Sequence, residues 1–163
     1  MSRVQRCCVF FLLAIGSAAA VQAQAGTYTN RQFGYSIRYP SSLLRPAASH
    51  SAEGQAFVPV VGRAGFRVFA APLNGRSPNE FADDAQAVCP GAHPSYRVAK
   101  PTLVAISCRA ADHIVYQKSL LRGDTAITVR GEYPQKERWI WDRVVTSIAR
   151  SMSAAPLEAD YQD

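Results

Sequence analysis

Two kinds of hydrophobic spacing divide the chain into short strands and two helices. Residues 34–39 alternate apolar and polar positions, with Tyr35, Ile37 and Tyr39 on one face, and Pro40 follows directly. Strict alternation is typical of a strand with one buried face, and proline cannot donate a hydrogen bond to a neighbouring strand. We therefore interpret this aromatic stretch as a core strand that needs no chemical role.

More strands are predicted further along, separated by turns that contain glycine or asparagine. Residues 28–30 lead into the first strand through a polar turn, and a loop rich in proline, alanine and serine follows that strand at 44–53. The later β-prone runs are 55–61, 65–71, 96–100, 103–109, 113–121 and 125–133. The rest of the chain therefore reads as strands with two helices.

The last two of these strands form the best-defined hairpin. Gly123 and Asp124 make a two-residue loop that would pair Arg122 with Thr125. This register puts an apolar set on one face: Ile114, Tyr116, Leu120, Ile127, Val129 and Tyr133. The other face receives mainly polar side chains: Gln117, Ser119, Thr128, Arg130 and Glu132. Lys118 falls among the apolar set, where we expect its stem to pack and its ammonium group to reach water, although such breaks also occur at functional sites.

Two helices are indicated by their start signals and apolar stripes. Ser77, Pro78 and Glu80 predict a capping box with proline in the first turn, opening a helix that runs to about residue 88. Pro134 opens a second helix whose apolar stripe faces the sheet: Trp141, Val144, Val145, Ile148 and Met152. Trp139 lies outside this stripe, and we expect it to pack on a sheet edge.

The first 25 residues have the pattern of a secretory signal peptide. Arg3 and Arg6 precede a mostly apolar run, and Ala23 and Ala25 offer cleavage positions. The run is short against the ~20 residues that span a bilayer, and no cysteine follows it for a lipid anchor. We expect residues 1–25 to be removed, leaving one soluble domain at 26–152 and a flexible tail at 153–163. The location would be periplasmic or secreted, with no membrane insertion after cleavage.

Charge and cysteine content exclude some classes of function. Removing Arg3 and Arg6 lowers the net charge from +6 to +4, and the remaining arginines are spread along the chain, so no nucleic-acid partner is expected. Cys89 and Cys108 are the cysteines that remain after the leader. An even pair in an oxidising compartment predicts a disulfide. A redox or nucleophilic thiol is the alternative, but the chain has no Cys-x-x-Cys motif.

The order of these segments resembles a known family. A Phe-Gly-Tyr-Ser-Ile-x-Tyr-Pro strand at 33–40, a mid-chain helix, the run 116–121, and Glu-Tyr-Pro at 132–134 before a tryptophan-bearing helix look like small exported bacterial proteins of uncharacterised function. Their plan is similar to the PsbP/Mog-like (DcrB-like) α/β/α sandwich. The resemblance implies an α+β fold in which helices cover a largely antiparallel sheet. It also implies binding or assembly roles, and it supplies no catalytic residues.

A search for catalytic motifs gives little. The chain lacks a Gly-x-Ser-x-Gly motif, a phosphate-binding glycine loop and a His-Glu-x-x-His pair. Asp112 and His113 are adjacent, but neighbouring residues of a strand point to opposite faces, so we do not expect them to converge on a metal. We predict no catalytic residue, metal or cofactor.

Two functions remain. The favoured one is a non-enzymatic binding or accessory protein with an unknown protein partner in the envelope, and an immunity protein against a secreted toxin is a special case. The candidate partner-binding residues are Gln117, Lys118, Arg130 and Glu132. The alternative is an enzyme or small-ligand binder acting on an envelope component. Its pocket would lie near His93, Asp112 or Lys118.

Overall fold

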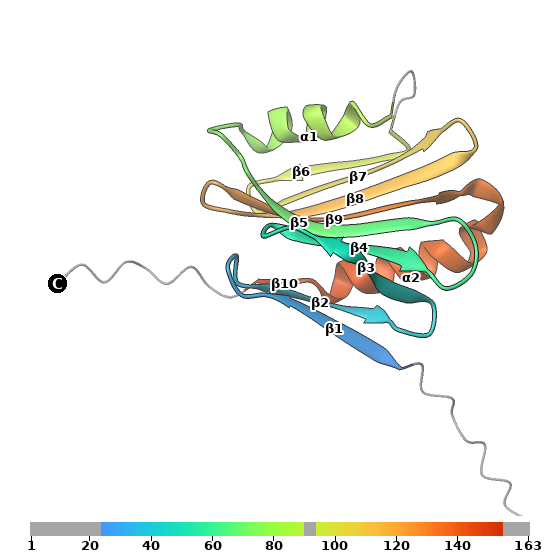
Figure 1. The fold of residues 1–163 in the computed structure, drawn as a ribbon. Coiled ribbons are helices and arrows are strands. Elements are labelled where there is room, and N and C mark those ends of the chain that lie inside the picture. The colour runs from blue at the N-terminus through green and yellow to red at the C-terminus, as the bar shows by residue number, and fades with distance from the viewer. Residues whose placement is uncertain (1–23, 90–93, 155–163) are drawn as a thin grey trace, which may run out of the picture.

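The computed structural model describes residues 24–89 and 94–154 as three packed layers (Figure 1). In chain order the elements are β1 (Ala25–Asn30), β2 (Tyr35–Pro40), β3 (Leu44–His50), β4 (Gly54–Pro59), β5 (Gly65–Pro72), α1 (Pro78–Gln86), β6 (Tyr96–Lys100), β7 (Leu103–Ala110), β8 (His113–Arg122), β9 (Thr125–Pro134), η1 (Gln135–Glu137), α2 (Arg138–Ser151) and β10 (Ser153–Ala154).

The middle layer is a seven-stranded antiparallel sheet in the order β3-β4-β5-β9-β8-β7-β6. Helix α1 covers one face of this large sheet. Helix α2 and a small sheet, ordered β1-β2-β10, lie side by side on the other face (Figure 1). The predicted α+β class, with helices covering a largely antiparallel sheet, is confirmed.

The β8–β9 hairpin has the register that the sequence predicts. Arg122 pairs with Thr125 across the two-residue loop, and Gly123 adopts the left-handed backbone that this turn requires. The apolar face of the hairpin packs into the core under α2, where Ile127 and Val129 are buried. The opposite face turns towards α1 and contributes Val115, Leu121 and Ala126 to a second buried cluster.

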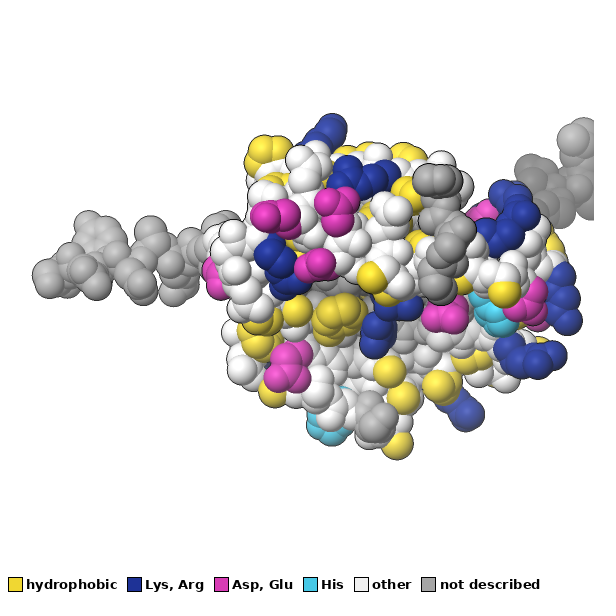
Figure 2. Space-filling model, turned by 90° about the horizontal axis from the view of Figure 1, so that it is seen from above, with side chains coloured by type: hydrophobic (Ala, Val, Ile, Leu, Met, Phe, Trp, Pro, Cys, Tyr) yellow, Lys and Arg dark blue, Asp and Glu magenta, His cyan; other side chains and the backbone are white. Residues whose placement is uncertain are grey.

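Both predicted helices form. At α1, the Glu80 backbone N–H donates to the Ser77 hydroxyl, and the Ser77 backbone N–H donates to the Glu80 carboxylate at 2.8 Å. This capping box lowers the pKa of Glu80, because hydrogen bonds from Ser77 favour the charged carboxylate. Ion pairs with Arg76 and Arg97 hold the outer face of α1, and Figure 2 shows cations and acids mixed on this side.

Helix α2 packs closely on the sheet through the predicted stripe, whose residues are all buried, the last of them just beyond the helix end: Trp141, Val144, Val145, Ile148 and Met152. Gly131 of β9 allows this approach, since a Cβ there would lie only 2.8 Å from both Phe66 and Val145. The expectation for Trp139 is wrong. Its side chain points away from the stripe and is 71% exposed.

Three strands were not expected. Residues 44–50 form β3, although proline and serine indicated a loop, because β4 offers the segment a pairing partner. Pro46 is tolerated since β3 is an edge strand with an irregular register. Residues 25–30 pair along the whole of β2 as β1, and Ser153–Ala154 pair with β2 as β10, where a free tail was expected.

The predicted disulfide joins Cys89 to Cys108, with the two Cα atoms 6.1 Å apart. Cys89 lies just beyond the end of α1, and Cys108 lies on β7. Both side chains are buried in the cluster beneath α1. The bond therefore fastens the end of this helix to the sheet face that it covers.

Candidate functional site

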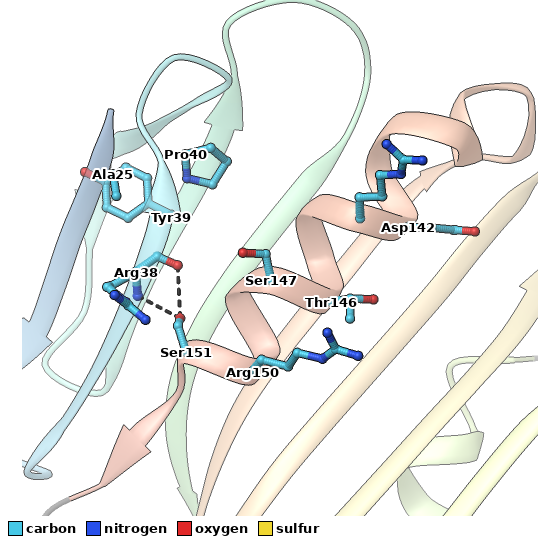
Figure 3. A pocket seen from close by; sticks show the side chains of 10 residues that line it. Ala25, Arg38, Tyr39, Pro40, Asp142, Thr146, Ser147, Arg150 and Ser151 are labelled. Atoms are coloured by element: carbon cyan, nitrogen blue, oxygen red, sulfur yellow. Dashed lines mark hydrogen bonds between the residues drawn. The ribbon is translucent and has the colours of Figure 1, made fainter. Parts of the chain in front are cut away.

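A cleft of about 790 Å³ opens between β2 and α2 (Figure 3). Arg38 stands on the β2 side of the cleft. The α2 side carries Arg143, Thr146 and Arg150, whose spacing of three and four residues puts them on one helix face. This face is opposite the buried stripe, and both of its arginines are exposed.

The three arginines of the cleft carry uncompensated charge. Arg38, Arg143 and Arg150 form no ion pair with a carboxylate of the described residues. Their guanidinium groups present planar sets of N–H donors, which match carboxylate and phosphate oxygens. An anionic group in the cleft can therefore accept hydrogen bonds from either wall.

Asp142 also lines the cleft but does not neutralise these arginines. Its carboxylate accepts hydrogen bonds from the Tyr133 hydroxyl at 2.9 Å and from Arg138 Nε at 3.4 Å. Figure 3 shows Asp142 pointing away from β2. Burial, followed by the bond to Asp142, raises the pKa of Tyr133, so this phenol remains a donor. The Asp142 carboxylate is thus bonded to Tyr133 and Arg138, on the side of α2 that faces away from β2.

Ser151 fixes the end of α2 against β2. Its hydroxyl oxygen accepts from the Arg38 backbone N–H at 2.8 Å, and its hydrogen lies within reach of the carbonyl oxygens of Arg38, at 3.1 Å, and Ile148, at 2.7 Å. In Figure 3 Ser151 stands between Arg38 and Arg150. The hydrogen bonds of the Ser151 hydroxyl therefore fix the backbone of Arg38 relative to the end of α2, which carries Arg150.

The four candidate residues of the hairpin do not share one open surface. Gln117 is only 7% exposed, the Arg130 side chain is 18% exposed, and Glu132 is half exposed. Lys118 lies on the opposite face of β8. A buried hydrogen bond of 2.8 Å between Ser119 and Thr128 completes the polar row under α1. Binding of a partner by these residues stays a prediction.

Lys118 has a structural contact that explains its place among apolar residues. Its ammonium group donates to the carbonyl oxygen of Ala149, in the last turn of α2, at 2.7 Å. Burial lowers the pKa of this lysine. A cation at a helix C-terminus interacts favourably with the helix dipole, so Lys118 joins the hairpin to the helix end.

Replacing Lys118 with methionine should therefore lower the free energy of unfolding by about 1 kcal/mol, since a charge-assisted hydrogen bond is lost while the stem volume is kept. Urea denaturation followed by circular dichroism would measure this. Lys100→Met, at an exposed position on the edge strand β6, is the matched control and should change stability by less than about 0.5 kcal/mol. Equal stability of the two variants would contradict the contact.

Asp112 and Lys118 lie too far apart to belong to one pocket. From His113 to Lys118 the strand rises about 17 Å at ~3.4 Å per residue, so Asp112 and Lys118 cannot serve one reacting centre. His93 lies outside the described residues. The side chains of Asp112 and His113 do meet, at 2.6 Å, because Asp112 belongs to a turn and does not alternate with His113 as a strand residue would. Within the described residues no three His, Cys, Asp or Glu side chains gather as a metal site.

Comparison with known proteins bears on the fold. No protein-family model and no curated protein matches the chain. The solution structure of cyanobacterial PsbP (CyanoP) from Synechocystis sp. PCC 6803 matches 86% of this chain and 99% of its own length, with a TM-score of 0.60. The chain has a PsbP-like fold. At 12% sequence identity the likeness is one of fold, and the PsbP-like architecture leaves the binding chemistry to the side chains of this chain.

The arginine cleft was missed from the sequence because its walls are far apart along the chain. Arg38 and Ser151 are 113 residues apart. The helical spacing of Arg143, Thr146 and Arg150 could have indicated a polar face opposite the stripe. Nothing in the pattern placed Arg38 beside it within the PsbP-like fold.

Proposed function

We propose that this chain is a non-enzymatic binding or accessory protein of the periplasm or the extracellular space, which holds an acidic segment of a protein partner in the cleft between β2 and α2. The observation that carries the proposal is the placement of Arg38, Arg143 and Arg150 on the two walls of one cleft without a carboxylate partner among the described residues.

The chemistry of the cleft supports an acidic peptide segment. Bidentate bonds between arginine and carboxylate are among the stronger hydrogen bonds in proteins, and clustered charge steers an oppositely charged partner towards its site. Tyr39 and Pro40 add apolar surface beside Arg38. A segment that alternates carboxylates with small apolar side chains would fit both features. An immunity protein that binds a secreted toxin is one form of this function.

The leader and the disulfide support a location outside the cytoplasm. Residues 1–25 have the signal-peptide pattern, and the bond between Cys89 and Cys108 suits an oxidising compartment. Neither helix of the described chain is long and apolar enough to cross a bilayer. The partner would then be a protein of the envelope or a secreted protein.

Site-specific crosslinking tests the proposal. A benzoylphenylalanine at Ser147, in the cleft, should form an adduct with one protein in envelope extract. Arg143→Glu together with Arg150→Glu should weaken binding of that protein by at least about tenfold, because the guanidinium groups become repulsive carboxylates. Mass spectrometry would identify the adduct, and the purified pair would give the affinity.

The matched control reverses the same amount of charge elsewhere. Arg31→Glu together with Arg63→Glu changes two exposed arginines that do not line the cleft, and this pair should keep the adduct. Equal adduct yield from the two double variants, or no adduct from Ser147, would refute the proposed cleft.

A further inference from the structure

Arg67 and Arg130 stand directly opposite each other on β5 and β9. Their pairing neighbours that of Val68 with Val129, which belongs to the core under α2, so the arginines lie on the other sheet face. Like charges at directly opposite strand positions repel. Burial, followed by the charge of Arg67, lowers the pKa of Arg130. The sheet therefore holds a partly buried guanidinium, that of Arg130, directly beside the exposed one of Arg67.

The neighbouring side chains compensate little of this charge. The nearest carboxylate oxygen, from Glu132, is 3.7 Å from the Arg130 guanidinium, which is longer than a hydrogen bond. Arg67 has no ion pair within residues 24–89 and 94–154, and its guanidinium lies 5.1 Å from the centre of the Phe69 ring. A desolvated charge is costly unless a hydrogen-bonding partner accompanies it.

Gln117 lies beside Arg130 on the next strand, β8, so that Arg67, Arg130 and Gln117 form a row across three strands. It pairs with Arg130 between β8 and β9 and is only 7% exposed. Its amide makes no side-chain hydrogen bond with the described residues, yet no fully enclosed side-chain nitrogen or oxygen there lacks a partner. The Gln117 amide is therefore not fully enclosed by the described residues.

The row ends at an open cleft. Arg67 and Phe69 line a space of about 490 Å³ together with His50, Ser51, Glu53 and residues 54–56 of β4. Glu53 forms no ion pair with Arg67. Figure 2 looks onto this side of the molecule and shows cationic, acidic and apolar side chains next to one another. The apolar ring gives a flat surface next to the charged row.

We propose that Arg67, Arg130 and Gln117 form a binding site for one oxyanion group, a carboxylate or a phosphate, of a small molecule whose remaining part lies against Phe69. The two guanidinium groups supply charge and parallel donors, and the amide supplies a further donor. The site is on the sheet face opposite the cleft of the proposed function, and it does not depend on that function.

Two probes test the site on the full folded chain: inorganic phosphate, and benzoate, which adds an aromatic ring to a carboxylate. Each is titrated at constant ionic strength against chloride while the Nε–Hε signals of the arginines and the side-chain amide of Gln117 are followed by NMR. We expect saturable shifts at Arg130 and Gln117 with both probes. Tighter binding of benzoate would identify a carboxylate ligand that stacks on the ring, and tighter binding of phosphate would identify a phosphate ligand.

Arg67→Gln should weaken either probe by at least about tenfold. In chloride alone the melting temperature of this variant should be equal to or higher than that of the wild type, because a like-charge pair is removed. With saturating probe the wild type should have the higher melting temperature, because it binds the probe more tightly. Arg63→Gln, an exposed arginine near the start of β5, changes the net charge equally and should keep wild-type affinity. Arg143→Glu with Arg150→Glu should also bind normally.

Two results would overturn the site. One is an equal response of Arg67→Gln and Arg63→Gln to the probes. The other is a linear, unsaturating shift in the wild type, which would show general ionic screening. Because Arg67 is exposed, its replacement leaves the core intact, so neither result can be attributed to misfolding.

Discussion

Replacing Trp141 with alanine is expected to lower the free energy of unfolding by about 3–5 kcal/mol, the largest effect of any single change considered for this chain. The indole is 3% exposed and lies between α2 and the large sheet, with its ring centre 5.4 Å from that of Phe66. Its N–H donates to the Glu137 carboxylate at 2.9 Å. Alanine would leave a cavity and an unmatched acceptor at the start of the helix.

Trp139 offers a matched control on the same helix. It is the same residue type two positions earlier, but it is 71% exposed, so Trp139→Ala should change stability by less than about 0.5 kcal/mol. Urea denaturation monitored by circular dichroism would measure both variants. Similar losses from the two substitutions would show that α2 does not pack as the structure describes.

Removing the disulfide should have the second largest effect. Changing Cys89 and Cys108 together to alanine is expected to cost about 2–5 kcal/mol, because the crosslink restricts the unfolded chain across a separation of 19 residues and both side chains are buried. The melting temperature and the urea midpoint would both fall.

A reductant provides the control for this loss. Dithiothreitol should destabilise the wild type by a similar amount and should leave the double alanine variant unchanged, since that variant has no bond to reduce. Wild-type protein that is purified from an oxidising compartment with two free thiols, or that is insensitive to reduction, would show that the bond does not form.

The features that could be predicted from the sequence are those that depend on residues close together along the chain. The capping box at Ser77, the two-residue loop before Thr125 and the stripe that begins at Trp141 each depend on residues within a few positions of one another. Their side chains meet through local helix or hairpin geometry, and the structure confirms all three.

The missed features depend on contacts between distant segments. Residues 44–50 look like a loop, and β4 makes them a strand. The two residues of β10 are too few to carry any pattern. The arginine cleft was missed for the same reason, because Arg38 meets α2 only in the folded chain. Arg130 was a candidate from the sequence, but its neighbour Arg67 is brought to it only by the pairing of β5 with β9.

The contact made by Ser151 closes the outer edge of β2. Along that edge Ser36 pairs with Ser153, the N–H and carbonyl of Arg38 are occupied by the serine hydroxyl, and Pro40 has no N–H to offer. An open strand edge is a template on which another chain can add a strand. The Ser151 hydroxyl thus extends the cover that β10 gives to this edge of β2, and it disfavours the pairing of another chain there.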